Sequence, residues 1–276
     1  MGSIDGIKDL GEIRVSIERG EQLKAVLQFP FIKGIYLDEG AFSEEELLKY
    51  RGEIQNSGKW SGLRFRRIQR REDRGRSPKD WMEEAKNEEG FSHFLLRTLD
   101  QVAMLQDFPD RKFSTCFDYT LYSYNQSAME VWESLGAKEM CFPIEFRFQE
   151  DMAFSEWAKS RRISTELLCY GHLPMMVSAN CIEKTRNGCT RGNNVVSLQD
   201  RQNKSMPVRL YCKYCYNQIY NSDVLSLIGL EKEVERLGAS SFRFDFTVES
   251  EKEILDLFQG RPLKQFTRGH FHKGIE

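Results

Sequence analysis

The sequence predicts an α/β fold of the (β/α)8 TIM-barrel type, with a long cysteine-bearing loop after the seventh strand. Short β-branched and aromatic runs alternate with amphipathic helical stretches along the whole chain. About eight such pairs occur, which is the number in a TIM barrel. The connections are long enough for parallel crossovers. An open doubly wound sheet is the alternative, but no glycine-rich phosphate-binding sequence follows the first strand.

The individual elements follow from local patterns. Ser43 with Glu46 forms a capping box that starts a helix, Pro78 opens another, and Asn125 caps a helix that ends at Gly136. The predicted strands are residues 13–17, 32–38, 63–68, 93–97, 114–122, 140–146, 166–170 and 241–248. The predicted helices are residues 21–28, 43–55, 78–87, 99–106, 125–136, 152–159, 224–237 and 252–258.

Length and composition limit the possible classes of protein. The 276 residues fit a single barrel domain, with a metal-binding loop at 173–223 and a tail at 261–276. The formal net charge of -2 excludes a polycation, so any contact with nucleic acid needs a local basic patch. No apolar run is long enough to span a bilayer, and the N-terminus lacks the apolar core of a signal peptide. We therefore expect a cytoplasmic protein with reduced thiols.

Four of the seven cysteines lie in the loop after the seventh strand. Cys181 and Cys189 are separated by seven residues, and Cys212 and Cys215 form a C-x2-C pair. Thiolates at such spacing can surround one metal centre, and the spacing alone leaves structural zinc and an iron–sulfur cluster open. The other three, Cys116, Cys141 and Cys169, lie inside strands and are predicted to fill the core.

In a TIM barrel, function sits at the carboxyl ends of the strands. The polar residues predicted there are Glu18, Asp38, Arg66, Arg67, Arg97, Asn125, Glu145, His172, Thr247 and Glu249. The cysteine loop follows a strand of the same barrel, so its metal would lie at or beside this face.

An arginine run follows the third strand and is predicted to overhang this face. It consists of Arg64, Arg66, Arg67, Arg70, Arg71, Arg74 and Arg76. Guanidinium groups can bind phosphates or carboxylates bidentately, which makes Arg66, Arg67 and, from the fourth strand, Arg97 candidates for substrate binding, together with Asn125. The alternative is a solvated loop balanced by its own acidic residues.

Acidic residues and one histidine are the candidates for acid–base chemistry. Glu145, Glu166 and Asp118 can bind a ligand or act as a general base, and His172 follows the seventh strand. Paired structural carboxylates are the alternative for the three acids. The sequence has no G-x-S-x-G or H-E-x-x-H motif, so no standard hydrolytic site is predicted.

Several segments together resemble the collagenase-like peptidase family U32, whose catalytic type is unknown. The most specific are YGHLPMMVSANCIEKTRNGC at 170–189 and CKYCYNQIYNS at 212–222. The segment FDYTLYSYNQSAMEVWESLGAKEMCFPIEF at 117–146 resembles the region of the family's fifth and sixth strands. FRFDFTVES at 242–250 resembles its last strand, and FTRGHFHKGIE at 266–276 the C-terminus of long members. Residues 1–90 resemble the family only in the layout of their predicted strands and helices.

The resemblance implies a barrel and two classes of activity. The family is named for proteolysis, and several branches hold a 4Fe–4S cluster on four cysteines and take part in oxygen-independent hydroxylation of RNA bases or ubiquinone precursors. Carried over to this sequence, the ligands would be Cys181, Cys189, Cys212 and Cys215, although their spacing differs from that of the hydroxylating branches. Long members have an additional N-terminal region, so a partner protein or a missing region is also implied.

Three functions are therefore expected. The first is an iron–sulfur enzyme that modifies RNA or a small molecule, with an anionic substrate such as RNA phosphates or a prephenate-like carboxylate donor. The second is a collagenase-like peptidase. The third is a non-catalytic RNA-binding subunit.

Overall fold

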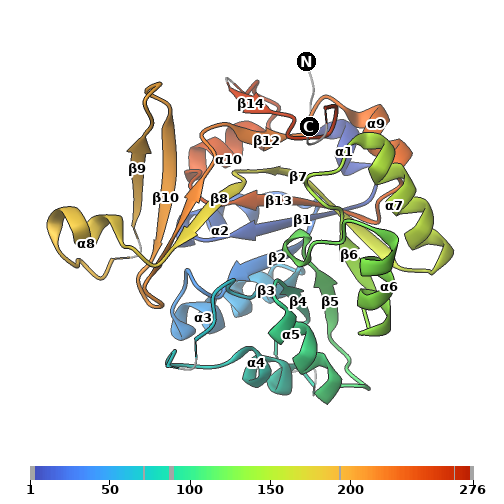
Figure 1. Cartoon of the computed structure of the whole chain (residues 1–276), viewed down its shortest axis with the longest axis horizontal. Helices are drawn as coiled ribbons and strands as arrows, with labels where there is room; N and C mark the ends of the chain where they lie inside the picture. The colour runs from blue at the N-terminus through green and yellow to red at the C-terminus, as the bar shows by residue number, and fades with distance from the viewer. Residues whose placement is uncertain (1–3, 71, 87–89, 193, 264, 274–276) are drawn as a thin grey trace.

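The computed structural model describes residues 4–70, 72–86, 90–192, 194–263 and 265–273. Eight parallel strands form a closed barrel, because the last of them, β13, pairs with both β1 and β7. The predicted TIM-barrel fold is therefore confirmed. Helices surround the barrel, and a smaller sheet extends to one side of it (Figure 1).

All eight predicted barrel strands are present. They are β1 Glu12–Ile17, β2 Ile32–Asp38, β3 Trp60–Arg64, β4 His93–Leu96, β5 Ser114–Phe117, β6 Glu139–Cys141, β7 Ser164–Gly171 and β13 Ser241–Phe246. The predictions for β3, β5 and β6 extended too far along the chain. After β6, Pro143 has no N–H to donate to a neighbouring strand, and the chain turns there, with the Phe146 amide donating to the Pro143 carbonyl at 3.4 Å.

The three helices for which the sequence predicts a start signal begin there, whereas the helix predicted at 152–159 already begins at Phe148. The Ser43 side chain and Glu46 form a capping box, and Asn125 Oδ1 accepts from the Ala128 amide at 2.9 Å. The helices are α1 Asp5–Lys8, α2 Gly20–Val26, α3 Glu44–Asn56, α4 Pro78–Ala85, α5 Leu99–Met104, η1 Leu105–Asp107, η2 Tyr119–Leu121, α6 Gln126–Ser134, α7 Phe148–Ser160, α8 Ile182–Asn187, α9 Glu231–Leu237 and α10 Glu251–Phe258. Residue 87, the predicted end of the third helix, lies outside the described residues. None of the helices in the described ranges combines the length and apolar character needed to cross a membrane.

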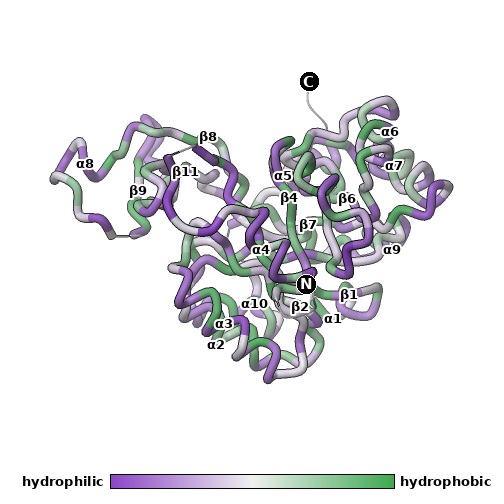
Figure 2. The backbone as a smooth tube through the Cα atoms, turned by 90° about the horizontal axis from the view of Figure 1, so that it is seen from below, coloured by the Kyte–Doolittle hydropathy of each residue, from purple (hydrophilic) through white to green (hydrophobic). Residues whose placement is uncertain are grey.

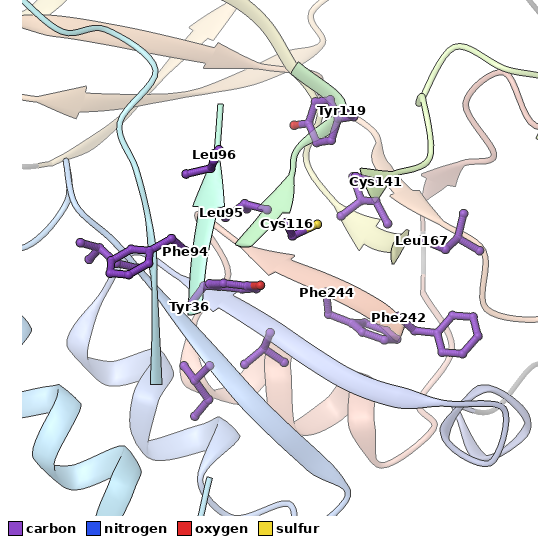
Figure 3. Close-up of a cluster of buried hydrophobic side chains, with 14 of the residues drawn as sticks. Tyr36, Phe94, Leu95, Leu96, Cys116, Tyr119, Cys141, Leu167, Phe242 and Phe244 are labelled. Atoms are coloured by element: carbon purple, nitrogen blue, oxygen red, sulfur yellow. The ribbon is translucent and has the colours of Figure 1, made fainter. Parts of the chain in front are cut away.

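The apolar core fills the layer between strands and helices and parts of the barrel interior. Figure 3 shows Tyr36, Cys116 and Cys141 among core side chains contributed by several strands. Cys116, Cys141 and Cys169 are all buried, as predicted. Burial raises the pKa of each of these thiols, which keeps them protonated and unreactive.

The long cysteine-bearing loop predicted after the seventh strand contains a four-stranded antiparallel sheet. Its strands are β8 Pro174–Ser178, β9 Val195–Gln199, β10 Ser205–Tyr211 and β11 Tyr216–Tyr220, in the order β8-β11-β10-β9. We call this sheet, together with α8, the cysteine module. Figure 2 shows α8 and β9 lying away from the barrel body. These strands were not predicted, and the edge strand β9 has no fully buried residue, because its side chains alternate between exposed and partly buried.

The predicted helix at 224–237 is wrong in its first half. Val224–Ser226 forms a short strand, β12, which pairs with β7 on one side and with β14, Phe266–Thr267, on the other. The helix α9 begins only at Glu231, after a turn in which Gly229 has φ +94°. The pairing with β7 outweighs the helical propensity of the segment.

The C-terminal tail packs against α7 and encloses a buried carboxyl group. The Phe148 amide donates to the Phe271 carbonyl at 2.9 Å, and the two rings lie 5.6 Å apart. A cavity of about 30 Å³ beneath the tail is lined by Asp151, Arg268 and apolar side chains. Oδ1 of Asp151 has no hydrogen-bond partner, and burial, with a contribution from Glu150, raises the pKa of this carboxyl to about 8.

We predict that Asp151→Asn stabilises the protein increasingly as the pH rises. Because the folded-state pKa is raised from 3.8 to about 8, the protonated carboxyl favours folding at low pH and this contribution is lost as the pH rises through 8. The amide cannot ionise. Above about pH 8, the free energy of unfolding of the variant should therefore exceed that of the wild type by about 1–3 kcal/mol. Urea unfolding between pH 5 and 9 measures the difference, and a pH-independent difference would contradict the assignment.

Candidate functional site at the barrel mouth

A network of buried ion pairs occupies the interior of the barrel toward the carboxyl ends of its strands. Arg64, the last residue of β3, contacts three carboxylates from three other strands or the turns that follow them. It pairs with Glu18, with Asp38 at 2.8 Å and with Asp245 at 3.5 Å. All four side chains are buried. A single guanidinium therefore joins the ends of β1, β2, β3 and β13.

A second arginine holds the centre of the barrel. Arg243 of β13 is completely buried and donates to Asp118 at 2.7 Å and to Glu166 at 2.6 Å. Its Nε lies 3.0 Å from Asp245, so the two arginines share that carboxylate. Arg243 therefore connects β13 with β7 and with the turn after β5.

Two further arginines complete the network. Toward the amino ends of the strands, Arg14 of β1 donates to Glu139 at 2.8 Å and to Glu166 at 3.1 Å. At the other end, Arg97 lies 3.3 Å from Asp118. The barrel interior therefore contains buried ion pairs as well as apolar side chains.

The network sets the protonation of its carboxyl groups in two directions. Burial alone would raise the pKa of Asp118, but Arg243 and Arg97 more than offset it and lower the pKa. At Glu18 and Glu166, burial outweighs the neighbouring arginines and raises the pKa. Proton uptake by the network is therefore easier at Glu18 and Glu166 than at Asp118.

The cysteine module covers this network at the carboxyl end of the barrel. Arg209 of β10 donates to the Glu18 carbonyl at 2.9 Å, and its Nε lies 3.4 Å from the Glu18 carboxylate. The Tyr220 hydroxyl of β11 donates to the same carboxylate at 3.1 Å. The module is thereby bound to the barrel through the buried charges and closes the centre of the mouth.

Gly40, after β2, permits this close approach. A Cβ at this position would lie 2.9 Å from the Tyr211 ring and 3.1 Å from both the Asp38 carboxylate and the Tyr216 hydroxyl. The Tyr211 and Tyr216 rings stack at 4.6 Å. A side chain at Gly40 would separate the module from the barrel.

The space that remains open lies at the side of the mouth. A cleft of about 370 Å³ is bounded by the turn after β5, the segment after β6, and β8. Arg67 donates to the Tyr122 hydroxyl at 2.9 Å across it. Tyr122 is 49 % exposed and has φ +58°, a conformation that bulky residues rarely adopt. Such strain is concentrated at functional sites in proteins.

The other walls of the cleft are apolar and acidic. Met175 and Met176 of β8 are 65 % and 57 % exposed, unusual for methionines. Glu145 also lines the cleft, and one of its oxygens is buried without a hydrogen-bond partner. Burial, followed by contact with Glu145, raises the pKa of the Tyr124 hydroxyl. The cleft therefore combines an aromatic surface, a cation and a carboxylate with spare hydrogen-bonding capacity.

The four loop cysteines lie in one part of the cysteine module. Cys181 precedes α8 and its sulfur accepts from the Lys184 amide at 3.5 Å, while Cys189 follows the helix. Cys212 and Cys215 lie in the tight turn between β10 and β11. Burial raises the pKa of Cys212, and the three other cysteines raise it further, which indicates that each of them lies near Cys212.

The thiols do not already form a closed ligand set. Among the described residues, no group of three or more histidine, cysteine or acidic side chains is arranged to hold a metal ion. The carboxylates of Glu18, Asp38, Asp118 and Glu166 in the barrel network form ion pairs with arginines instead.

Comparison with known proteins identifies the fold. The U32 peptidase Mk0906 is similar over 87% of this chain and 94% of its own, with a TM-score of 0.54 and 9% sequence identity. The fold is that of a U32 peptidase. The spore cortex-lytic enzyme SleL of Bacillus cereus matches with a TM-score of 0.47 and 10% identity, over 93% of this chain and 74% of that one. No family model and no curated protein matches the sequence.

The resemblance to family U32 predicted from the sequence is thus confirmed at the level of fold. Within this U32-like barrel, the predicted catalytic candidates lie in three different places. Glu145 lines the cleft and Glu166 is buried in the network. His172 lies beyond β7, where its Nδ1 is 2.8 Å from the Asn221 carbonyl and its Nε2 3.9 Å from Glu249.

The predicted substrate-binding residues are also dispersed. Arg67 lines the cleft, whereas Arg97 belongs to the buried network. Arg66 is buried in an ion pair with Glu39. The Asn125 side chain caps α6. The structure therefore places Arg67 and Glu145 together in the cleft, and Arg97 and Glu166 together in the buried network.

The rest of the arginine run is mostly engaged within the protein. Arg70 donates to the Tyr214 carbonyl at 2.5 Å, and Arg76 pairs with Glu84. Arg74 is exposed, and Arg71 lies outside the described residues.

Sequence reasoning missed Arg14 and Arg243 as members of the network. A signal was present, because EIRVSI at 12–17 and SFRFDF at 241–246 place polar residues at alternating positions, as expected for strands that point charges inward. Tyr122, Met175 and Met176 carried no comparable signal, since only the fold brings these distant segments together.

We predict that Arg243→Met strongly destabilises the protein. The substitution leaves Asp118, Glu166 and Asp245 without their shared cation, which should cost about 3–5 kcal/mol of unfolding free energy. Arg161→Met is the control, because Arg161 is partly exposed and pairs with Glu130 and Glu133 at the surface, where the expected loss is about 0–1 kcal/mol. Urea denaturation compares the two, and equal losses would contradict a dependence on the network.

Proposed function

We propose that this chain is an iron–sulfur enzyme of the U32-like fold that modifies RNA or a small anionic molecule by an oxygen-independent, hydroxylation-type reaction. The observation that carries the proposal is the gathering of Cys181, Cys189, Cys212 and Cys215 in one module that is bound to the carboxyl end of the barrel. In this fold class, chemistry takes place at that end.

The donor set fits a 4Fe–4S cluster. All four candidate ligands are thiols, the ligands that iron–sulfur clusters use. The Lys184 amide hydrogen bond to Cys181 is of the kind that stabilises a thiolate and tunes a cluster's potential. Cys189 and Cys215 are exposed, so both thiols are accessible to an incoming cluster. A bound cluster would supply one-electron transfer or a Lewis-acidic iron.

The side cleft is the proposed substrate site. The exposed Tyr122 ring and the adjacent methionines offer a surface on which a base or another flat group can stack. Arg67 supplies a positive charge for a phosphate or carboxylate group. Glu145 lines the same cleft and supplies a carboxyl group that can accept a hydrogen bond from the substrate.

We predict that the protein purified or reconstituted without oxygen is brown and holds about four iron and four sulfide ions per chain. Cys212→Ala should lose the colour and most of the iron. Cys169→Ala is the matched control, because Cys169 is buried in the barrel, and it should keep both. Iron and sulfide analysis with visible spectroscopy decides the question. A colourless wild-type protein with one zinc ion per chain would overturn the proposal.

The second candidate function is proteolysis, which is favoured by the similarity to a structure described as a U32 peptidase. A hydrolase needs an activated nucleophile or a metal with an open coordination position. The pair of His172 and Glu249, 3.9 Å apart, is the candidate base for such a site.

We predict for this alternative that wild-type protein cleaves gelatin and that His172→Gln, which can retain a hydrogen bond to the Asn221 carbonyl, reduces cleavage at least about a hundredfold. His93→Gln is the control, because His93 lies at the opposite end of the barrel, at the start of β4. Absence of cleavage by the wild-type protein, or equal cleavage by both variants, would set the peptidase function aside.

A further inference from the structure

The tip of the β10–β11 turn is held unusually firmly for a hairpin tip. Tyr214 lies between Cys212 and Cys215, and its amide donates to the Tyr211 carbonyl at 3.1 Å. Its side chain is only 3 % exposed, although the two flanking thiols are partly or fully exposed. Cys215 has φ +49°, so the turn adopts a conformation that a non-glycine residue rarely takes without support.

Two arginines from the loop after β3 provide that support. The Arg66 guanidinium lies over the Tyr214 ring, 4.2 Å from its centre, and its Nη1 is 3.3 Å from the Tyr214 hydroxyl. Arg70 donates to the Tyr214 carbonyl at 2.5 Å. The ring and the backbone of this one residue are therefore held from the barrel side by separate contacts.

The arginines are themselves fixed to the barrel. Arg66 forms a buried ion pair with Glu39, and its amide donates to the same carboxylate at 3.2 Å. The Glu39 amide in turn donates to the carbonyl of Arg64, the central residue of the buried network. A continuous set of contacts thus extends from the barrel mouth to the cysteine pair, which is a separate attachment from the Glu18 contacts of Arg209 and Tyr220.

We propose that Arg66 and Arg70 are positioning residues for the cysteine pair. They hold Tyr214 so that Cys212 and Cys215 face Cys181 and Cys189 before a metal centre is bound. This inference rests on the proposed iron–sulfur site, and it assigns part of the arginine run to the metal centre instead of to substrate phosphates. The contacts of Arg66 and Arg70 described above are with Tyr214, so their effect on the cysteine pair is transmitted through this residue.

Ordinary packing at an interface is the competing explanation, and it makes a different prediction. If the contacts only add stability, their loss should not change metal uptake at temperatures where the protein remains folded. If the contacts position the thiols, their removal should make the β10–β11 turn more mobile and also reduce metal uptake, while the barrel stays unchanged.

The test compares variants of the full-length protein. Arg70→Ala removes the carbonyl contact, and Tyr214→Ala removes the ring. Tyr214→Phe keeps the ring beneath Arg66 and should therefore behave like the wild type. Arg74→Ala is the matched control, since it removes an exposed arginine from the same loop. Hydrogen–deuterium exchange of the 208–220 peptide is measured on the metal-free protein, and iron content after anaerobic reconstitution is measured on the same preparations.

We expect exchange in the 208–220 peptide to rise about tenfold in Arg70→Ala and Tyr214→Ala, equivalent to about 1.4 kcal/mol of local opening free energy. Iron content should fall at least about twofold in both. Tyr214→Phe and Arg74→Ala should match the wild type, and barrel peptides should be unchanged in all variants.

The inference would be overturned if the 208–220 peptide exchanged at the wild-type rate in both alanine variants. It would also be overturned if the peptide exchanged faster but the iron content after reconstitution did not fall. If the wild-type protein itself takes up no iron, the proposed function fails. In that case, unchanged exchange would still refute the proposal that Arg66 and Arg70 hold Tyr214. Faster exchange with unaltered uptake of zinc, offered as the metal alone, would refute their role in positioning the thiols.

Discussion

The pairing of Arg64 and Arg243 with carboxylates inside the barrel is the interaction on which the rest of the structure depends. Charges that are removed from water are tolerated only when they are paired and hydrogen-bonded. Asp245 lies between the two guanidinium groups, and the remaining partners come from the other strands and the turns after them. The strand ends are therefore held in one relative arrangement by electrostatics as well as by the backbone ladder.

The same charges determine where the cysteine module lies. Glu18 has a buried carboxylate that Arg64 shares with Arg209 and Tyr220 of the module. Because the module satisfies hydrogen-bonding capacity that would otherwise be buried unpaired, its position on the mouth is specific. The centre of the mouth is closed as a result, and the accessible space is displaced to the cleft beside β8. A substrate would meet Tyr122 and Arg67 before any residue of the network.

The arginine run illustrates how a single sequence feature divides into several roles. Arg64 joins the barrel network, Arg66 and Arg70 hold Tyr214, and Arg67 faces the cleft. Since side chains alternate in direction and the loop leaves β3 at Arg64, neighbouring arginines reach different partners. The run thus connects the barrel, the cysteine pair and the cleft.

The sequence alone determined the barrel, the helix caps at Ser43 and Asn125, and the burial of Cys116, Cys141 and Cys169, because alternating patterns and capping preferences are local properties of the chain. It also placed the four cysteines in the connection after β7. Only the tertiary structure decided that this connection folds into a sheet, that Glu166 and Arg97 are buried with partners, and that Arg67 and Glu145 share a cleft. These facts depend on contacts between residues that are far apart in sequence, such as Arg209 with Glu18, and no local pattern specifies which distant charge a side chain will meet.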